Sequence, residues 1–198
     1  MILSIYVVSF AISAVLILAA CQFYLWHRRR VPIDLPKLRS PLDDRVSRVP
    51  SWVWKYSLLY YPAILYMNAL LRTAEQFTRV AFGYLVLLAL HASLLQVFAA
   101  RPAYRWRPAA AGVGHAERLL ALVRFYDVRS SSFPSMQTSV ATLTALHLYG
   151  HGGALALALP LPIGVSRLSK QHYVMDVPAG AALGWAVYRL FPGSLAGY

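Results

Sequence analysis

The sequence predicts an all-α integral membrane protein, a bundle of six transmembrane helices in a single domain. The composition supports this class, because 59% of the 198 residues are hydrophobic and only 13% are charged. Soluble domains carry about 25% charged residues. Uncharged runs of the length that crosses a bilayer, about 20 residues, recur along the chain. One cysteine excludes a disulfide framework, and the scattered histidines form no metal-binding motif.

Six apolar runs predict the spans, at residues 2–26, 51–71, 80–100, 135–149, 154–165 and 173–191. The first run is too long for a signal peptide and is followed, not preceded, by the basic cluster "HRRR", so it is expected to remain as an anchor. The second opens with "SWVWKY", which is typical of an interfacial aromatic belt. The last three are short or interrupted, and their small residues, among them Gly180 and Gly184, favour close helix packing.

Two connections are longer than the rest. Residues 31–50 carry four prolines and mixed charge, which predicts an irregular surface loop that, with the first span, precedes a core over residues 51–198. Residues 101–133 contain "HAERLLALVRFY", with apolar residues at helical spacing between arginines. This pattern predicts either a short interfacial helix between the third and fourth spans or an ordinary loop helix.

Positive charge is strongly biased to one end of the predicted bundle. Six spans put both termini at one end and bring the start of the fourth span and the junction of the fifth and sixth to the other, here called the polar end. Of the 19 lysine and arginine residues, all but Arg72, Arg79 and Arg189 fall at the polar end. The positive-inside rule then places the polar end in the cytoplasm, although part of this charge could serve phosphate binding instead.

A net charge of +12 also raises the possibility of nucleic-acid binding. The basic residues lie beside membrane spans, where anionic lipid headgroups are the nearer partner. We therefore expect anionic membrane lipids, and no nucleic acid, as partners.

The segment "SRLSKQHYVMDVPAG", residues 166–180, concentrates ionisable side chains near the membrane. His172 and Asp176 are four residues apart, so on a helix they share a face. A carboxylate beside an imidazole fixes its tautomer and stabilises its protonated form. Arg167 and Lys170 are cations of the kind that bind phosphate oxygens. The alternative is an interfacial cluster with an ordinary His–Asp contact.

The segment "FPSMQTS", residues 133–139, predicts the start of a helix. Pro134 suits the first helical position, with one of residues 131–133 as the cap. Ser135, Thr138 and Ser139 then line the first turn, where free N–H groups and the helix dipole favour an anion. The alternative is a plain helix cap.

Together these segments resemble the type 2 phosphatidic acid phosphatase superfamily. Its three motifs are Lys, six residues, Arg-Pro; Pro-Ser-Gly-His; and Ser-Arg, five residues, His, three residues, Asp. "FPSM" and "KQHYVMDVPAGAALG" are most similar to the branch of inositol phosphorylceramide synthases and related bacterial membrane enzymes. The resemblance spans residues 50–190 and implies a phosphatase or phosphotransferase that acts on lipid phosphates in a bacterial cell membrane, without a metal or other cofactor. Most members of the family work on the exoplasmic or lumenal face, so the side of the site stays open, with the charge bias favouring the cytoplasm.

The resemblance also implies roles for individual residues. His172 would be the nucleophile that forms a phosphohistidine, and Asp176 would orient it and stabilise its charge. Ser135 and the N–H groups around Met136 would hold phosphate oxygens. Covalent catalysis divides the transfer into two in-line steps, and neither requires a metal if arginines neutralise the oxygens.

The chain departs from the family pattern in its cations. "ARPAYRWRP" offers Arg101 and Arg107 before prolines but no lysine at the family's spacing, and Arg107 is the preferred phosphate ligand, with Arg101 second. In the third motif four residues, not five, separate Arg167 from His172. Lys170 could therefore share the task of Arg167.

The largest departure is Gln137, which stands where the family has the histidine that protonates the leaving group. Glutamine donates a hydrogen bond but no proton, and general acid catalysis contributes about 10²–10⁴-fold. Of the possible replacements, His147 lies ~15 Å too deep along the span, His151 lies at the opposite end, and His115 and Asp127 lie in the polar-end loop. An acidic leaving group would need little protonation, and a deliberate histidine-to-glutamine substitution is also compatible with the sequence. Two functions stay open: a lipid-phosphate enzyme with an impaired acid, or a non-catalytic scaffold or carrier that binds phospholipid headgroups.

Overall fold

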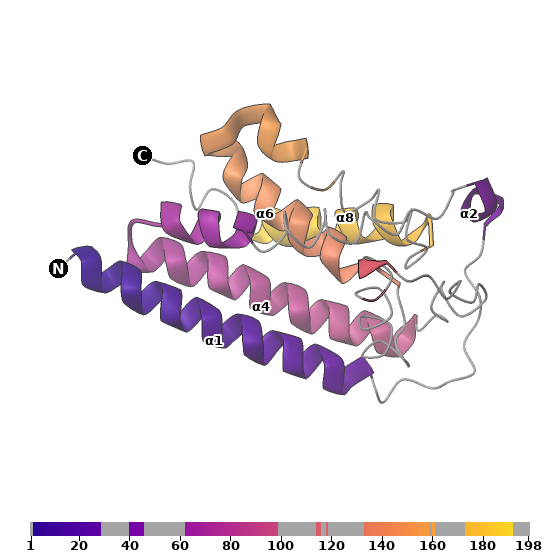
Figure 1. Ribbon diagram of the computed structural model, residues 1–198, viewed down its shortest axis with the longest axis horizontal. Coiled ribbons are helices and arrows are strands. Elements are labelled where there is room, and N and C mark those ends of the chain that lie inside the picture. Colours follow the sequence, from indigo (N-terminus) through magenta and orange to yellow (C-terminus); the bar gives the residue numbers. More distant parts are fainter. Residues whose placement is uncertain are drawn as a thin grey trace.

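The computed structural model describes residues 2–28, 40–45, 62–98, 114–115, 118, 133–158, 160 and 173–191. All regular secondary structure in these ranges is helical, which confirms the predicted all-α class for this part of the chain (Figure 1). The elements are α1 (Ile2–Arg28), α2 (Pro41–Arg45), a helix at residues 62–70, α4 (Ala74–Val97), α6 (Met136–Gly152), the 3₁₀-helix η2 (Gly153–Ala158) and α8 (Asp176–Leu190).

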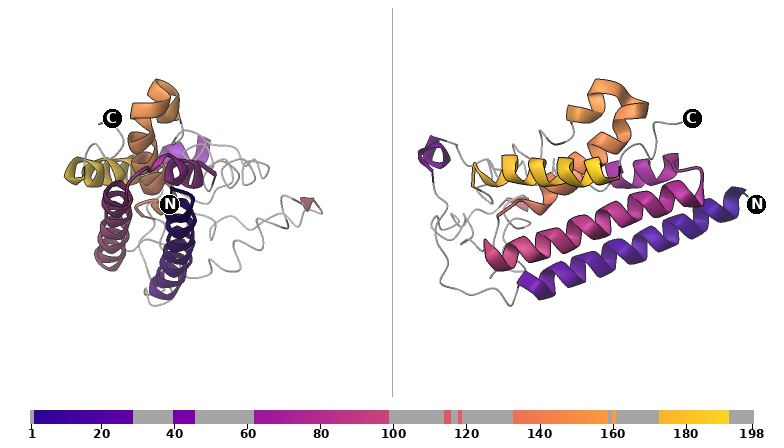
Figure 2. Two further views of the ribbon diagram at one scale, coloured as in Figure 1. Left: turned by 90° about the vertical axis from the view of Figure 1, so that its left-hand side faces the viewer. Right: turned by 180° about the vertical axis from the view of Figure 1, so that it is seen from behind.

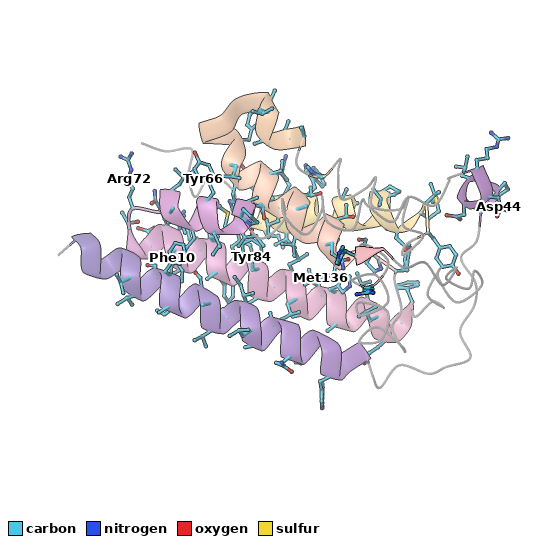
Figure 3. All side chains as sticks on the ribbon, in the orientation of Figure 1. Phe10, Asp44, Tyr66, Arg72, Tyr84 and Met136 are labelled. Carbon is cyan, nitrogen blue, oxygen red and sulfur yellow. The ribbon has the colours of Figure 1, made fainter. Side chains whose placement is uncertain are left out.

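The long helices form a bundle in which α1, residues 62–70, α4 and α6 alternate in direction, and α8 repeats the direction of α6. Helices α1 and α4 run side by side in one direction, whereas residues 62–70, α6 and α8 run in the other (Figures 1 and 2). The starts of α6 and α8 therefore lie together at one end, the polar end of the sequence argument, and the start of α1 lies at the opposite end. Arg72 also lies at that opposite end (Figure 3), as the predicted charge distribution requires.

Helix α4 is the one described helix that is long and apolar enough to cross a membrane. It has 24 residues and a mean hydropathy of 1.9, and 39% of its apolar stretch is buried within the molecule. A shorter apolar stretch, Val7–Ala20, lies in α1. Val15 and Leu18 of α1 and Phe82 of α4 are exposed, as expected of side chains that face lipid.

The start of α4 lies six residues before the predicted span. Thr73 accepts a hydrogen bond from the Gln76 N–H, and the Gln76 side chain accepts one from the Thr73 N–H, which completes a capping box. Glu75 and Arg79 lie in this added turn of α4 and pair on its exposed surface at 2.6 Å.

Helix α6 ends at a glycine that the prediction did not single out. Gly153 has a φ of +54°, a conformation that disfavours residues with a Cβ, and it follows α6 directly. The chain then forms η2, so residues 154–158 of the predicted fifth span are 3₁₀ and not α-helical. Residues 51–61, 99–100, 159 and 161–165 of the predicted spans lie outside the described residues. So does the predicted interfacial helix, except for residues 115 and 118.

Two glycines on α8 allow its close approach to α6. A Cβ on Gly180 would overlap the carbonyl oxygen of Ser135, and one on Gly184 would overlap that of Ser139. Small residues four apart are the usual means by which membrane helices bring their backbones together. The prediction that small residues pack these helices closely is confirmed at Gly180 and Gly184.

The packing of α6 on α4 adds a buried polar link to the apolar core. The core cluster joins Leu87, Val140, Leu143 and Val187. Thr144 lies 2.6 Å from the Tyr84 hydroxyl, and its own hydroxyl is 2.8 Å from the carbonyl oxygen of Val140. Since a threonine hydroxyl has one proton, the Thr144 hydroxyl donates to Val140 and accepts from Tyr84. This hydrogen-bonded link therefore fixes the position of α6 along the axis of α4.

Candidate functional site

The start of α6 is tied directly to the start of α8. Ser135 is the N-cap of α6, and its N–H donates to the carbonyl oxygen of Asp176 at 3.1 Å. The Ser135 Oγ accepts from the Thr138 N–H at 3.3 Å and from the Thr138 hydroxyl at 3.0 Å. Ser139 donates its hydroxyl to the Ser135 carbonyl oxygen at 2.9 Å. All four residues are buried, so this polar junction is enclosed by the packing of the two helices.

The cap lies two residues beyond the predicted range, residues 131–133. Pro134 precedes the cap and is not the first helical residue, because the Ser135 side chain supplies the acceptor for the first turn. The N–H groups of Met136 and Gln137 have no acceptor among the described residues. Two free N–H groups at the positive end of a helix dipole form the local geometry that binds anions. The backbone around Met136 therefore has the form expected of a phosphate cradle, although the Ser135 side chain already accepts two hydrogen bonds.

Asp176 closes a turn before α8. The carboxylate Oδ2 accepts from the Tyr173 N–H at 2.8 Å, and the Asp176 N–H donates to the Tyr173 carbonyl oxygen at 3.1 Å. Both residues are fully buried. Because α8 begins at Asp176, the prediction that His172 and Asp176 share a face of one helix is wrong. Asp176 instead holds the turn that begins at Tyr173, the chain neighbour of His172.

A second carboxylate that the sequence did not point to supports the same turn. Asp43 of α2 is buried, and its Oδ1 accepts from the Val174 N–H at 2.7 Å. Its Oδ2 accepts from the Ser40 N–H at 2.7 Å, and this bond begins α2 inside the segment predicted to be an irregular loop. A pairing across 131 residues leaves no local signal in a sequence; the one hint was an acidic residue in a possible first helical turn.

Replacing Asp43 with alanine is expected to destabilise the protein by about 1–3 kcal/mol, because it leaves the N–H groups of Ser40 and Val174 without an acceptor. Chemical unfolding in detergent measures the change. Asp44→Ala is the matched control, since Asp44 is the exposed neighbour on α2 (Figure 3). Equal effects of the two substitutions would contradict the importance of the Asp43 contact.

The side chain of Gln137 lies on the other side of α6 from α8. Ser139, two residues later and so ~200° around the helix, contacts the α8 glycines. Gln137 lines an apolar cavity with Met136 and Val140, and its side-chain oxygen is buried without a hydrogen-bond partner in the described part of the chain. The structure thus brings Ser135 and Asp176 together but directs Gln137 away from them.

The remaining candidates lie outside the described residues or far from the junction. His172, Arg101, Arg107, Arg167 and Lys170 are the predicted site residues that fall outside. The buried ring of His147 packs against Tyr188 at 5.3 Å between centroids, deep in the bundle, as its distance along α6 predicts. His115 is exposed. Within the described ranges, no group of three or more His, Cys, Asp or Glu side chains is placed to hold a metal ion.

Comparisons with protein-family models, with curated proteins and with solved structures give no significant match to this chain. The class that the described residues define is therefore an all-helical protein with one candidate membrane-spanning helix and a buried polar junction between two helix starts.

Proposed function

We propose that the protein is an integral membrane enzyme that removes or transfers the phosphoryl group of a lipid phosphate through a phosphohistidine at His172. The observation that carries the proposal is the hydrogen bond from the Ser135 N–H to the Asp176 carbonyl oxygen. It joins the helix start with free N–H groups to the segment in which the sequence places His172, Arg167 and Lys170. Phosphate ligands and a nucleophile from two distant segments would thereby meet at one end of the bundle.

The chemistry follows from these positions. The phosphate oxygens accept hydrogen bonds from the N–H groups of Met136 and Gln137, and Arg107, Arg167 or Lys170 neutralise their charge. An imidazole nitrogen of His172 attacks phosphorus while the bond to the lipid oxygen breaks, and the departing lipid oxygen takes its proton from water. Water or an acceptor alcohol then attacks phosphorus, the P–N bond breaks and the imidazole is regenerated. Asp176 fixes the turn next to His172 through its bond to the Tyr173 N–H.

The proposed membrane arrangement has six spans with the polar end in the cytoplasm. The directions of α1, residues 62–70, α4 and α6 alternate, and α8 runs parallel to α6, as a fifth span between these two helices would require. Arg72 lies at the opposite end, where the predicted charge distribution has it (Figure 3). Anionic headgroups of the cytoplasmic leaflet would then surround the site.

A second candidate function is a phospholipid-headgroup-binding scaffold or carrier without catalysis. The orientation of Gln137 favours it, because neither this amide nor its place on α6 provides a proton donor for a leaving group beside Asp176. The anion-binding start of α6 serves this function equally well.

Phosphate release from phosphatidate, polyprenyl phosphates and phosphoinositides by the wild-type protein and by Gln137→His separates these functions. We expect release from at least one lipid, and a change of less than about tenfold in Gln137→His, because residue 137 faces away from α8. A gain of about 10²–10⁴-fold would instead place residue 137 at the leaving group. No release by either form, with lipid binding retained, would support the scaffold and reject the enzyme.

A further inference from the structure

A cavity of about 230 Å³ lies between α1, residues 62–70, α4 and the first turns of α6. Its walls are mostly aliphatic and aromatic, with Leu16 and Ile17 from α1 and Leu88 from α4 among them. Along α4 the lining runs from Phe77 to Leu88, ~16 Å at the rise of an α-helix. The cavity is therefore elongated along α4, and its length suits an extended hydrocarbon chain.

The polar side chains in this lining are the hydroxyls of Ser13 and Tyr84 and two amides. Asn68 is 5% exposed, and its side-chain nitrogen Nδ2 is buried with no hydrogen-bond partner in the described part of the chain. The Gln137 side-chain oxygen Oε1 is also buried with no hydrogen-bond partner in the described part of the chain. A buried polar group without a partner is costly, so its retention in an apolar wall points to a ligand that supplies the missing bond.

The two amides lie at different depths. Gln137 and Thr144 are seven residues apart on α6, a separation of ~10 Å. The Tyr84 hydroxyl contacts Thr144 Oγ1 at 2.6 Å and Met67 Sδ at 3.7 Å, so Asn68, next to Met67, lies near the level of Thr144. Tyr84 and Met136 mark these two levels in Figure 3. Asn68 is thus about 10 Å deeper than Gln137, and the shallow end of the cavity adjoins the Ser135 cap.

We propose that this cavity holds the hydrocarbon chain of the lipid phosphate and that Asn68 donates a hydrogen bond to an oxygen carried far along that chain. The inference rests on the proposed function for the position of the phosphate, which lies at the start of α6. The chain then enters beside Met136 and Gln137 and runs between α1 and α4. The substrate class is a single-chain lipid phosphate with a distal hydroxyl or carbonyl group.

Dodecyl phosphonate tests occupancy of the cavity, because its carbon–phosphorus bond is not hydrolysed and binding is measured without turnover. In nanodiscs, Ala81→Trp should weaken its binding at least about tenfold, since Ala81 lines the cavity and tryptophan would fill it. Ala89→Trp is the matched control on α4, at an exposed position that does not line the cavity. Equal binding by the two variants, both folded by circular dichroism, would overturn the proposal.

The ω-hydroxyl derivative of dodecyl phosphonate tests Asn68. The wild-type protein should bind this hydroxyl derivative at least as tightly as it binds dodecyl phosphonate. The Asn68→Leu variant should bind the hydroxyl derivative about tenfold more weakly than it binds dodecyl phosphonate. Asn68→Leu should also raise the unfolding midpoint of the ligand-free protein, because it removes a buried group without a partner. The same preference in both proteins would overturn the role of Asn68. If phosphonates bind in the cavity but no lipid phosphate is hydrolysed, the proposed enzyme fails and the lipid site stands. If a lipid phosphate is hydrolysed but Ala81→Trp and Ala89→Trp bind dodecyl phosphonate equally, the lipid site fails and the proposed enzyme stands.

Discussion

Replacing His172 with alanine is expected to reduce phosphate release from lipid phosphates by about 10³-fold or more. Removal of a covalent nucleophile eliminates the phosphoenzyme path and leaves only the contribution of phosphate binding and orientation. The loss should appear in kcat, while lipid binding, which depends on the start of α6 and the cavity, is retained. Release of inorganic phosphate from the lipid that the wild-type protein hydrolyses best measures the effect.

The matched control for this experiment is Gln171→Ala, which changes the preceding residue and should retain turnover. Unchanged turnover in His172→Ala would reject the phosphohistidine mechanism. Equal losses of turnover in the two variants would mean that turnover depends on the folded structure of this segment and not on the imidazole of His172.

Replacing Gly184 with alanine is expected to cost about 3 kcal/mol of stability. The added Cβ would overlap the Ser139 carbonyl oxygen, so α8 must move away from α6 and loosen the junction of Ser135 with Asp176. This loss exceeds the gain of about 1 kcal/mol that alanine brings over glycine in a helix. Unfolding in detergent, followed by circular dichroism, measures the change.

Gly83→Ala provides the control for helix propensity. A Cβ at Gly83 meets only a Phe191 ring carbon at 3.9 Å, which is ordinary van der Waals contact. The substitution should therefore be neutral or raise stability by up to about 1 kcal/mol. A similar gain for Gly184→Ala would contradict the close packing of α6 and α8.

The sequence predicted those features of the fold that depend on local patterns. Apolar runs and short polar interruptions were sufficient to place α1, α6 and α8 within a few residues, and the small residues of α8 predicted its close packing. The capping box of α4 was overlooked because Glu75 and Arg79 place charge beside an apolar run, although they pair on the exposed surface. The exact cap of α6 depended on which hydroxyl reaches the Thr138 N–H, a choice among several serines that sequence spacing does not make.

Features that depend on contacts between distant segments were not predictable. Asp43 reaches Val174 across 131 residues, and neither residue belongs to a motif. The direction of Gln137 depends on which side of α6 receives α8. Gly180 and Gly184 indicate that α8 packs closely on another helix. The sequence does not indicate that these glycines face Ser135 and Ser139 of α6. The family resemblance placed residue 137 beside the nucleophile, whereas the packing turns it into the apolar cavity.

Trapping of the phosphoenzyme tests the proposed mechanism most directly. The purified protein would be mixed with a lipid phosphate labelled in its phosphoryl group, quenched rapidly in alkali and analysed by mass spectrometry. The mechanism predicts an acid-labile, alkali-stable phosphate on the imidazole of His172, and no label in His172→Ala. Turnover without any labelled histidine, or label that persists in His172→Ala, would contradict it.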